Sequence, residues 1–361
     1  MKIHTFFSVI FITLSQLAVA KQNPHVGISQ KVDSLEQHLG EITTDTALGK
    51  PSITTTTSWP DIEGNQWNIF IDVLLWKAKI AGTSFATTNN QFSVTEPIHG
   101  YCKDNHMHWD FGLKLGLSKK LNYDTWGLSG EFTYFTTTGG ASAKGGVENA
   151  IIPLKGPFAH PVQLASSQVK LKFYNIDLHL SRNYFISRTL ALQPFLGVKN
   201  TWNTFTQKVF YSKGPSLLNN TAATKDKNGM WGIGPEVGLD TTWYVGKGCH
   251  VNGLCTASIL YSYFNVKQHS YTTPSEAFNV FLSDKHHQFV PNMQCALGLG
   301  WSRFLNDKKN YLSFDINYET QYYWQMNQTL FLYEFKDTFR VQNMSADIAF
   351  YGVSAQIKLF F

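Results

Sequence analysis

The end of the chain alternates between apolar and polar positions. Every second residue is apolar or small: Tyr351, Val353, Ala355, Ile357, Leu359 and Phe361. The residues between them are polar or glycine, and only Phe360 breaks the pattern. Successive side chains of a β-strand point to opposite faces, so this period of two predicts a strand with one apolar face. An apolar strand at an open sheet edge invites aggregation, whereas a closed barrel in a membrane has no edge and needs a lipid-facing surface.

Nine earlier segments repeat this alternation. In 109–118, for example, Trp109, Phe111 and Leu113 alternate with Asp110, Gly112 and the residues that follow them. The nine segments are 67–77, 109–118, 126–136, 169–181, 190–199, 231–245, 255–267, 289–302 and 312–324. With the terminal segment 351–361 they make ten expected strands. A hairpin hidden in one of the long connections would raise the number to twelve.

The connections between these strands alternate between short and long. The short ones are 119–124, 182–188, 246–254 and 305–310, and the long ones are 87–104, 139–166, 205–229, 269–287 and 327–342. Short turns on one side and long loops on the other are typical of outer-membrane barrels. The predicted fold is therefore an all-β, transmembrane, antiparallel up-and-down β-barrel formed by residues 65–361.

Aromatic residues gather near the ends of the predicted strands: Trp67, Trp109, Trp126, Trp231, Trp243, Trp301, Tyr322 and Trp324. Amphipathic rings are favoured at the membrane–water interface, where they form girdles. The alternative is a soluble β-sandwich with an aromatic core. That fold would not explain the alternating loop lengths and the apolar terminus together.

The start of the chain predicts export. Lys2 precedes an apolar run from Phe6 to Leu14, and Ala18, Val19 and Ala20 form a small-residue cleavage site. We expect residues 1–20 to be a cleaved signal peptide, because the apolar run is shorter than the roughly 20 residues that cross a bilayer.

Residues 21–64 form a predicted periplasmic leader. Apolar positions spaced four, three, four and three residues apart predict an amphipathic helix from Ile28 to Ile42, followed by a Thr-rich linker. This helix could support a homo-oligomer, pack against the barrel, or be a marginal helix in a flexible leader.

The remaining composition excludes some classes of function. A formal net charge of +5 without a basic tract gives no nucleic-acid footprint. The four cysteines are too few for a disulfide-built fold, and none has zinc-site spacing. Cys249 and Cys255 flank a glycine-containing turn, so they could form an internal disulfide or cross-links to other envelope proteins.

Charged residues occupy the inward-facing phase of the predicted strands. The candidate lumen-lining residues are Asp72, Asp110, Lys114, Glu131, Asp177, His179, Lys199, Glu236, Asp240, Asp315, Glu319 and Lys358. Acidic residues outnumber lysines, and fixed carboxylates in a narrow pore favour cations, so we predict a weak cation preference. The alternative is that these charges pair and fill the lumen, because ten strands lie close to the eight that leave room only for side chains.

No pattern in the chain indicates an enzyme, a cofactor or a metal site. Gly232-x-Gly234 and Gly298-x-Gly300 superficially resemble dinucleotide-binding loops, but they have strand periodicity and no following helix. His106, His108, His286 and His287 lie near predicted loop ends, where solvated histidines are expected. No nucleophile, base and orienting residue share a recognisable spacing.

Several strand motifs resemble a known family. They are WNIFIDVLLWKA from Trp67, WDFGLKLGL from Trp109, YNIDLHLSR from Tyr174, LQPFLGVKNTW from Leu192 and YETQYYWQMN from Tyr318. They are similar to the Legionella-type major outer membrane protein family, also found in environmental relatives of the chlamydiae. The resemblance covers most of the chain after residue 65.

This resemblance implies a porin of the bacterial outer membrane that lets small solutes or ions diffuse passively. It also implies that the aromatic terminus Phe361 is read as a signal by the outer-membrane assembly machinery. The expected partners are then the lipid bilayer and that machinery. The alternative function is a structural or adhesive surface barrel with little or no conductance, which uses its loops for binding.

Overall fold

The computed structural model describes residues 67–89, 99–121, 126–146, 149–156, 160–187, 189–214, 221–273, 279–305, 310–335 and 338–361. The predicted signal peptide at 1–20 and the leader at 21–64, with its helix, lie outside these residues. Within the described part of the chain, no helix is long and apolar enough to cross a membrane.

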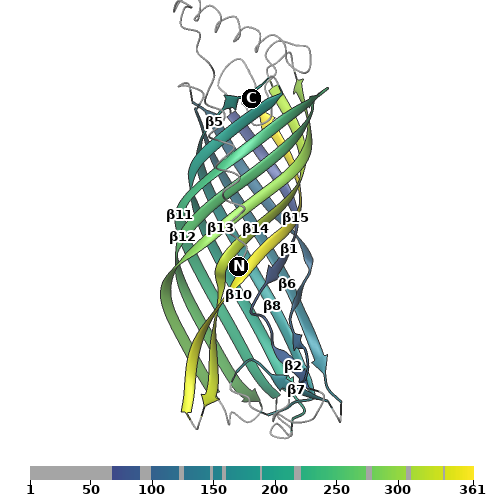
Figure 1. The fold of residues 1–361 in the computed structure, drawn as a ribbon, viewed down its shortest axis with the longest axis vertical. Coiled ribbons are helices and arrows are strands. Elements are labelled where there is room, and N and C mark those ends of the chain that lie inside the picture. The colour runs from purple at the N-terminus through teal and green to yellow at the C-terminus, as the bar shows by residue number, and fades with distance from the viewer. Residues whose placement is uncertain are drawn as a thin grey trace, which may run out of the picture.

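Ten long strands form one closed antiparallel barrel, shown in Figure 1. They are β1 (Trp67–Ile80), β5 (Trp109–Lys120), β6 (Trp126–Lys144), β8 (Leu164–Arg182), β10 (Leu190–Ser212), β11 (Thr221–Gly246), β12 (Cys249–Thr273), β13 (Asn279–Leu305), β14 (Asn310–Phe335) and β15 (Thr338–Phe360). Each strand pairs with the next in this order, and β15 pairs with β1. The up-and-down barrel predicted from the alternation is thus confirmed.

Five short strands accompany the barrel. β4 (His106–Met107) pairs with β6, and β9 (Tyr184–Phe185) pairs with β10. β2 (Ala86–Asn89), β3 (Cys102–Lys103) and β7 (Ala150–Pro153) form a small separate sheet. This small sheet lies at the end of the barrel opposite the carboxy-terminus (Figure 1).

The terminal strand closes the ring, as its apolar face predicted. The backbone N–H of Trp67 donates to the carbonyl of Phe361 at 2.9 Å, and the N–H of Phe361 donates to the carbonyl of Trp67 at 3.0 Å. From there the β1–β15 register runs from the Asn68–Phe360 pair to the Ile80–Ile348 pair. Every edge of the ten-stranded sheet is therefore paired.

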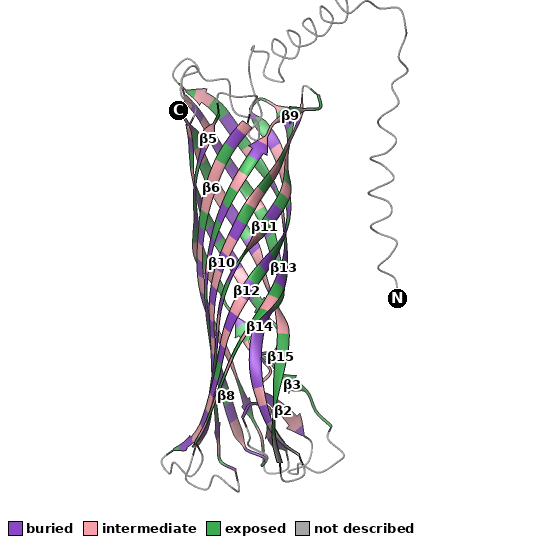
Figure 2. Cartoon of the chain, turned by 90° about the vertical axis from the view of Figure 1, so that its left-hand side faces the viewer, coloured by how far each residue is buried: buried purple, intermediate pink, exposed green. Residues whose placement is uncertain are grey.

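The outer face of the barrel is apolar, and Figure 2 shows exposed and buried residues alternating along the strands. Leu297 and Leu299 on β13, for example, are each about two-thirds exposed. A continuous aromatic row borders this face on neighbouring strands: Tyr134, Tyr174, Trp202, Trp231 and Tyr263 are paired in direct register. This row, called the aromatic row below, matches the interface girdle of a membrane barrel.

The short turns and the carboxy-terminus lie at one end of the barrel, which is the periplasmic end in such proteins. On β11 the apolar face runs from Trp231 to Trp243. At a tilt of about 40° these twelve steps span about 30 Å along the axis, the thickness of the hydrocarbon core. The segment from Thr221 to Met230 therefore protrudes beyond the membrane on the extracellular side.

The strands are longer at this extracellular end than the sequence predicted. Residues 205–212 and 221–229, expected in a long loop, belong to β10 and β11, and the same error affects the expected loops 269–287 and 327–342. The expected short turn 246–254 is also wrong in extent, because β12 already begins at Cys249. Only two extracellular connections, β1 to β5 and β6 to β8, are long.

The apolar face changes sides where the strands leave the membrane. On β10, Leu196 and Val198 face outward below the aromatic row, whereas Phe205, Val209 and Tyr211 are buried inside the barrel above it. The outward residues of this upper part include the polar Thr206 and Lys208, with Phe210 as an apolar exception. The barrel thus has a lipid-facing apolar surface in the membrane and an apolar core in the part that reaches water.

Candidate functional site in the barrel interior

The membrane-level interior is a polar chamber of about 200 Å³. It extends from the charged side chains at mid-barrel to polar residues at the periplasmic end, including Asn68, Ser118 and Gln193. Nine of the predicted lumen residues line it: Asp72, Lys114, Glu131, Asp177, His179, Glu236, Asp240, Glu319 and Lys358. Two further predicted residues do not line the chamber but form ion pairs with residues that do: Lys199 pairs with Glu236, and Asp315 pairs with Lys358. The alternation therefore identified the inward-facing charges of the membrane segment.

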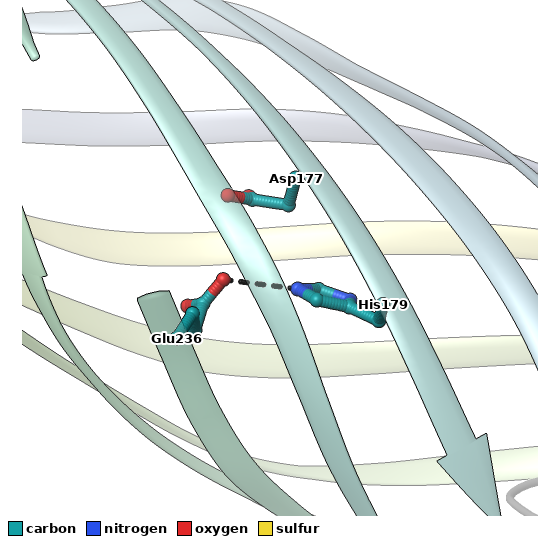
Figure 3. A group of neighbouring side chains, drawn as sticks. All are labelled: Asp177, His179 and Glu236. Atoms are coloured by element: carbon teal, nitrogen blue, oxygen red, sulfur yellow. Dashed lines mark hydrogen bonds and ion pairs between the residues drawn. The ribbon is translucent and has the colours of Figure 1, made fainter. Parts of the chain in front are cut away.

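Lys199 on β10 neutralises two carboxylates from its neighbouring strands. Its Nζ lies 3.1 Å from Oδ1 of Asp177 on β8 and 2.9 Å from Oε1 of Glu236 on β11. The other oxygen of Glu236 lies 3.0 Å from Nε2 of His179. Figure 3 marks this contact with a dashed line. All four side chains face the lumen because their positions have the same phase along adjacent strands.

Lys114 forms a second ionic group across the lumen. Its Nζ lies 3.4 Å from Glu131 on the adjacent strand β6 and 3.3 Å from Glu319 on β14. Since two strands of the ring, β1 and β15, lie between β5 and β14 by the shorter route, the Lys114–Glu319 pair links non-adjacent strands through the lumen. Ser354 donates a hydrogen bond to the same Glu319 at 2.8 Å. Lys114 also lies over the Trp76 ring, 5.9 Å from its centroid.

A third group contains a residue that sequence analysis missed. His250 Nε2 lies 2.7 Å from Oδ1 of Asp315, and Lys358 lies 3.6 Å from Oδ2 of the same carboxylate. Gly300, opposite both side chains, leaves the space they need, because an added Cβ would collide with His250 and Asp315. His250 lay inside the expected turn 246–254. Because no strand was predicted there, the alternation could not indicate that its side chain points inward.

Three predicted acidic residues differ from the others. Asp72 is buried in the chamber, and one of its oxygens has no hydrogen-bond partner among the described residues. Asp240 lines the chamber closer to its periplasmic end. Asp110 does not line it: this residue lies at the extracellular end of β5 and accepts a hydrogen bond from the N–H of Thr138 at 3.3 Å.

Only one group of side chains in the described chain has the donor set and spacing of a metal site. The ligand atoms of Asp177, His179 and Glu236 all lie within 4.8 Å of one another. The ammonium group of Lys199, however, already lies within 3.1 Å of both carboxylates. Lys199 therefore supplies the positive charge that a metal ion would bring, and the arrangement is that of an ionic cluster.

Above the chamber, packed aromatic rings fill the barrel. The ring centroids of Phe173 on β8 and Tyr323 on β14 are 5.7 Å apart, although four strands separate β8 from β14 in either direction around the ring. Phe350 contacts both rings and also Phe135 and Trp76, at 4.8 to 6.2 Å. These five residues, called the aromatic plug below, are each at most 1% exposed.

Sequence analysis did not predict the aromatic plug. Two of its members adjoin residues of the aromatic row, as Phe135 follows Tyr134 and Phe173 precedes Tyr174. Two consecutive aromatic residues break the period-two pattern, and this break was the available signal. It marks the level at which the apolar face moves from the outside of the barrel to the inside.

The extracellular mouth is filled by the connections that follow β1 and β6. Lys155 lies 3.3 Å from the buried Asp226 on β11, and its backbone N–H donates to the Tyr211 hydroxyl at 3.1 Å. The Tyr211 hydroxyl in turn donates to the carbonyl of Phe85. Burial raises the pKa of Tyr211, so this hydroxyl stays neutral. Both connections are therefore anchored to the inner wall of the protruding barrel.

The cysteines are placed differently from the expectation. All four are free, and Cys249 and Cys255 lie six positions apart on the same strand, β12. This separation is about 20 Å, far beyond the roughly 7 Å that a disulfide allows between Cα atoms. The structure therefore does not support their pairing. Cys255 instead lies directly opposite Cys295 on β13, with 3.4 Å between the two sulfur atoms.

The closed ring, apolar outer face, aromatic row and charged interior define a β-barrel protein of the bacterial outer membrane. The model of the family described as Legionella pneumophila major outer membrane protein precursor matches residues 60–361, and the chain belongs to this family. The match confirms the resemblance seen in the strand motifs. A comparison with curated proteins gave no match.

The chain is also similar to several solved structures of outer-membrane proteins. The outer membrane protease OmpT of Escherichia coli is 13% identical, with a TM-score of 0.42, covering 85% of this chain and 99% of its own. The toluene transporter TodX of Pseudomonas putida is 8% identical, with a TM-score of 0.31, covering 82% of this chain and 90% of its own. A FadL homologue of Pseudomonas aeruginosa is 9% identical, with a TM-score of 0.24 and coverages of 88% and 95%. At these values the likenesses carry no argument about activity.

Proposed function

We propose that this protein is a structural surface barrel of the outer membrane, closed to the passive diffusion of solutes. The observation that carries the proposal is the aromatic plug, whose five residues are at most 1% exposed. A continuous water channel would leave at least some of these side chains accessible to water.

The surroundings of the plug support the same conclusion. Further apolar side chains from β10, β11, β12 and β13 are buried at its level, among them Phe205, Met230, Phe264 and Val290. Together they form one core that extends into the protruding part of the barrel. Ten strands lie near the size at which side chains fill a barrel, so the packing agrees with the strand number.

A closed barrel can still serve at the cell surface. The strands β10 to β14 extend well beyond the aromatic row, and the apolar core makes this extension rigid in water. The proposed role is therefore to present this extension and its loops as a stable outer surface. Catalysis is not part of the proposal, and we infer that the chain is not an enzyme.

The test is solute flux through the folded full-length protein in liposomes. We expect no swelling with small sugars and no stepwise conductance in planar bilayers above the level of protein-free membranes. The folded state is checked by the electrophoretic mobility shift between heated and unheated samples. Swelling at a rate comparable to that of a general porin would contradict the proposal.

A porin is the second candidate, and the charge of the chamber favours it. Six carboxylates and two lysines line the chamber, and the adjoining Asp315 and Lys199 add one of each. The lumen therefore has a net negative formal charge when His179 and His250 are neutral. If the aromatic plug moved aside, these carboxylates would favour cations. Conductance with asymmetric KCl tests this candidate, and a reversal potential that indicates anion preference would exclude the proposed selectivity.

A further inference from the structure

One side of the protruding barrel has a dense group of outward-facing lysines. This basic patch consists of Lys170 and Lys172 on β8, Lys208 on β10, Lys225 and Lys227 on β11, and Lys267 on β12. All six are exposed, and Lys285 on β13 extends the patch. Among the described residues, none of these lysines forms a salt bridge.

The register places like charges side by side. Lys208 is paired directly with Lys225, and Lys227 is paired directly with Lys267. Directly opposed like charges destabilise a sheet, because their Cβ atoms are only about 5 Å apart. The outward faces of β8, β10, β11, β12 and β13 above the aromatic row have no acidic side chain within the described residues. The protein itself therefore leaves this charge uncompensated, and an external anion would relieve the repulsion.

The height of the patch indicates where that anion would lie. Lys227 and Lys267 are four residues beyond Trp231 and Tyr263 of the aromatic row, and Lys225 is six residues beyond Trp231. At a strand tilt of about 40° they lie about 10 to 15 Å above the row. A glycerophospholipid headgroup layer is only about 5 to 8 Å thick, so its phosphates would not reach most of the patch.

We propose that the basic patch binds the phosphate groups of phosphorylated glycolipids in the outer leaflet. The patch continues the lipid-facing surface directly, so a lipid whose acyl chains lie against the apolar band would extend its head groups over the lysines. Sugar-linked phosphates reach higher than glycerol-linked ones, which fits the height of Lys225 and Lys208. Opposed lysine pairs offer two ammonium groups to one phosphate, a strong charge-assisted arrangement.

The experiment measures equilibrium binding of fluorescent bisphosphorylated lipid A to the folded full-length protein in neutral detergent. The test variant is K225Q/K227Q, and the matched control is K77Q/K79Q. The control lysines have the same two-residue spacing on β1, which lies on the opposite side of the ten-stranded ring from β11. We expect about 25-fold weaker binding for the test variant, since each lysine near an anionic lipid contributes about fivefold, and less than about twofold for the control.

Two further arms identify the ligand chemistry. Dephosphorylated lipid A should bind the wild-type protein far more weakly than the bisphosphorylated form, and phosphatidylglycerol should compete poorly. A second test variant, K208Q/K267Q, should reproduce the loss if the first variant folds badly. Equal effects of the test and control variants, equal binding of dephosphorylated lipid A, or full competition by phosphatidylglycerol would each overturn the proposal.

Discussion

Buried lysines hold the charged chamber together. Lys199 is 1% exposed and lies between two carboxylates that are themselves buried. A charge taken out of water costs several kcal/mol unless a partner compensates it. The ionic cluster is therefore a site where a single substitution changes the stability of the whole barrel.

Replacing Lys199 by Met should lower the free energy of unfolding by about 3–5 kcal/mol, because Asp177 and Glu236 would keep their burial and lose their shared cation. Urea unfolding of the inserted barrel, followed by tryptophan fluorescence, measures the change. The control is Lys208→Met, since Lys208 is exposed and outside this cluster. A loss below about 1 kcal/mol would show that Lys199 is not needed to neutralise the two carboxylates.

The cysteine pair on the outer face gives a second prediction at this scale. Cys255 and Cys295 are direct cross-strand neighbours with sulfur atoms 3.4 Å apart. A mild oxidant should therefore link them within one chain, and peptide mapping by mass spectrometry should find that bond. Cys249→Ser should leave the bond unaffected, whereas Cys295→Ser should abolish it. Detection of a Cys249–Cys255 peptide instead would contradict the register of β12 and β13.

At the level of the strands, the pairing of β15 with both β1 and β14 completes the barrel. Sequence alternation located ten strands and, except for the start of β12, their periplasmic ends, because there the outside is apolar and the inside is polar. It missed the extracellular halves of β10 to β15, where the outward positions are Thr, Lys and Asn and the apolar residues point inward. In a strand whose apolar face changes sides, the alternation of apolar and polar residues is interrupted. The sequence of these extracellular halves therefore resembled that of loops.

Deleting Phe361 should reduce assembly of the barrel more than it changes any property of barrels that do assemble. The deletion removes two backbone hydrogen bonds to Trp67 and an exposed aromatic side chain at the closing strand. The fraction of heat-modifiable protein in outer-membrane preparations measures assembly. Phe361→Tyr keeps the backbone and the ring and should assemble normally. Unchanged assembly of the deletion variant would exclude a role for the terminal residue as a signal.

At the level of the whole molecule, the barrel consists of two parts with opposite polarity. The membrane part has an apolar outside and an ionic chamber, and the protruding part has a polar outside and an apolar core. The aromatic plug lies at the boundary between these two parts, level with the aromatic row. The proposed closure of the lumen would therefore follow from the same change of polarity that lets the barrel reach into water.

Opening the plug should create a conducting pore. In Phe173→Ala/Phe350→Ala, two central rings of the plug are lost, and the variant should show ion conductance that the wild type lacks. Each truncation also costs about 3–5 kcal/mol, so assembly must be verified first. The control Phe281→Ala/Phe289→Ala removes two outward-facing rings and should stay closed. A folded variant without conductance would mean that the surrounding core closes the lumen on its own.

The amino-acid sequence by itself determined the barrel, its location and the inward-facing charges of the membrane segment. These follow from local alternation, because in lipid every strand must turn its apolar residues outward and pair its backbone with its neighbours. Only the tertiary structure decided which charges pair, that Cys255 meets Cys295, and that rings from β8 and β14 meet across the lumen. Such contacts join residues far apart in the chain, so they depend on the register and closure of the ring, which alternation within one strand does not encode.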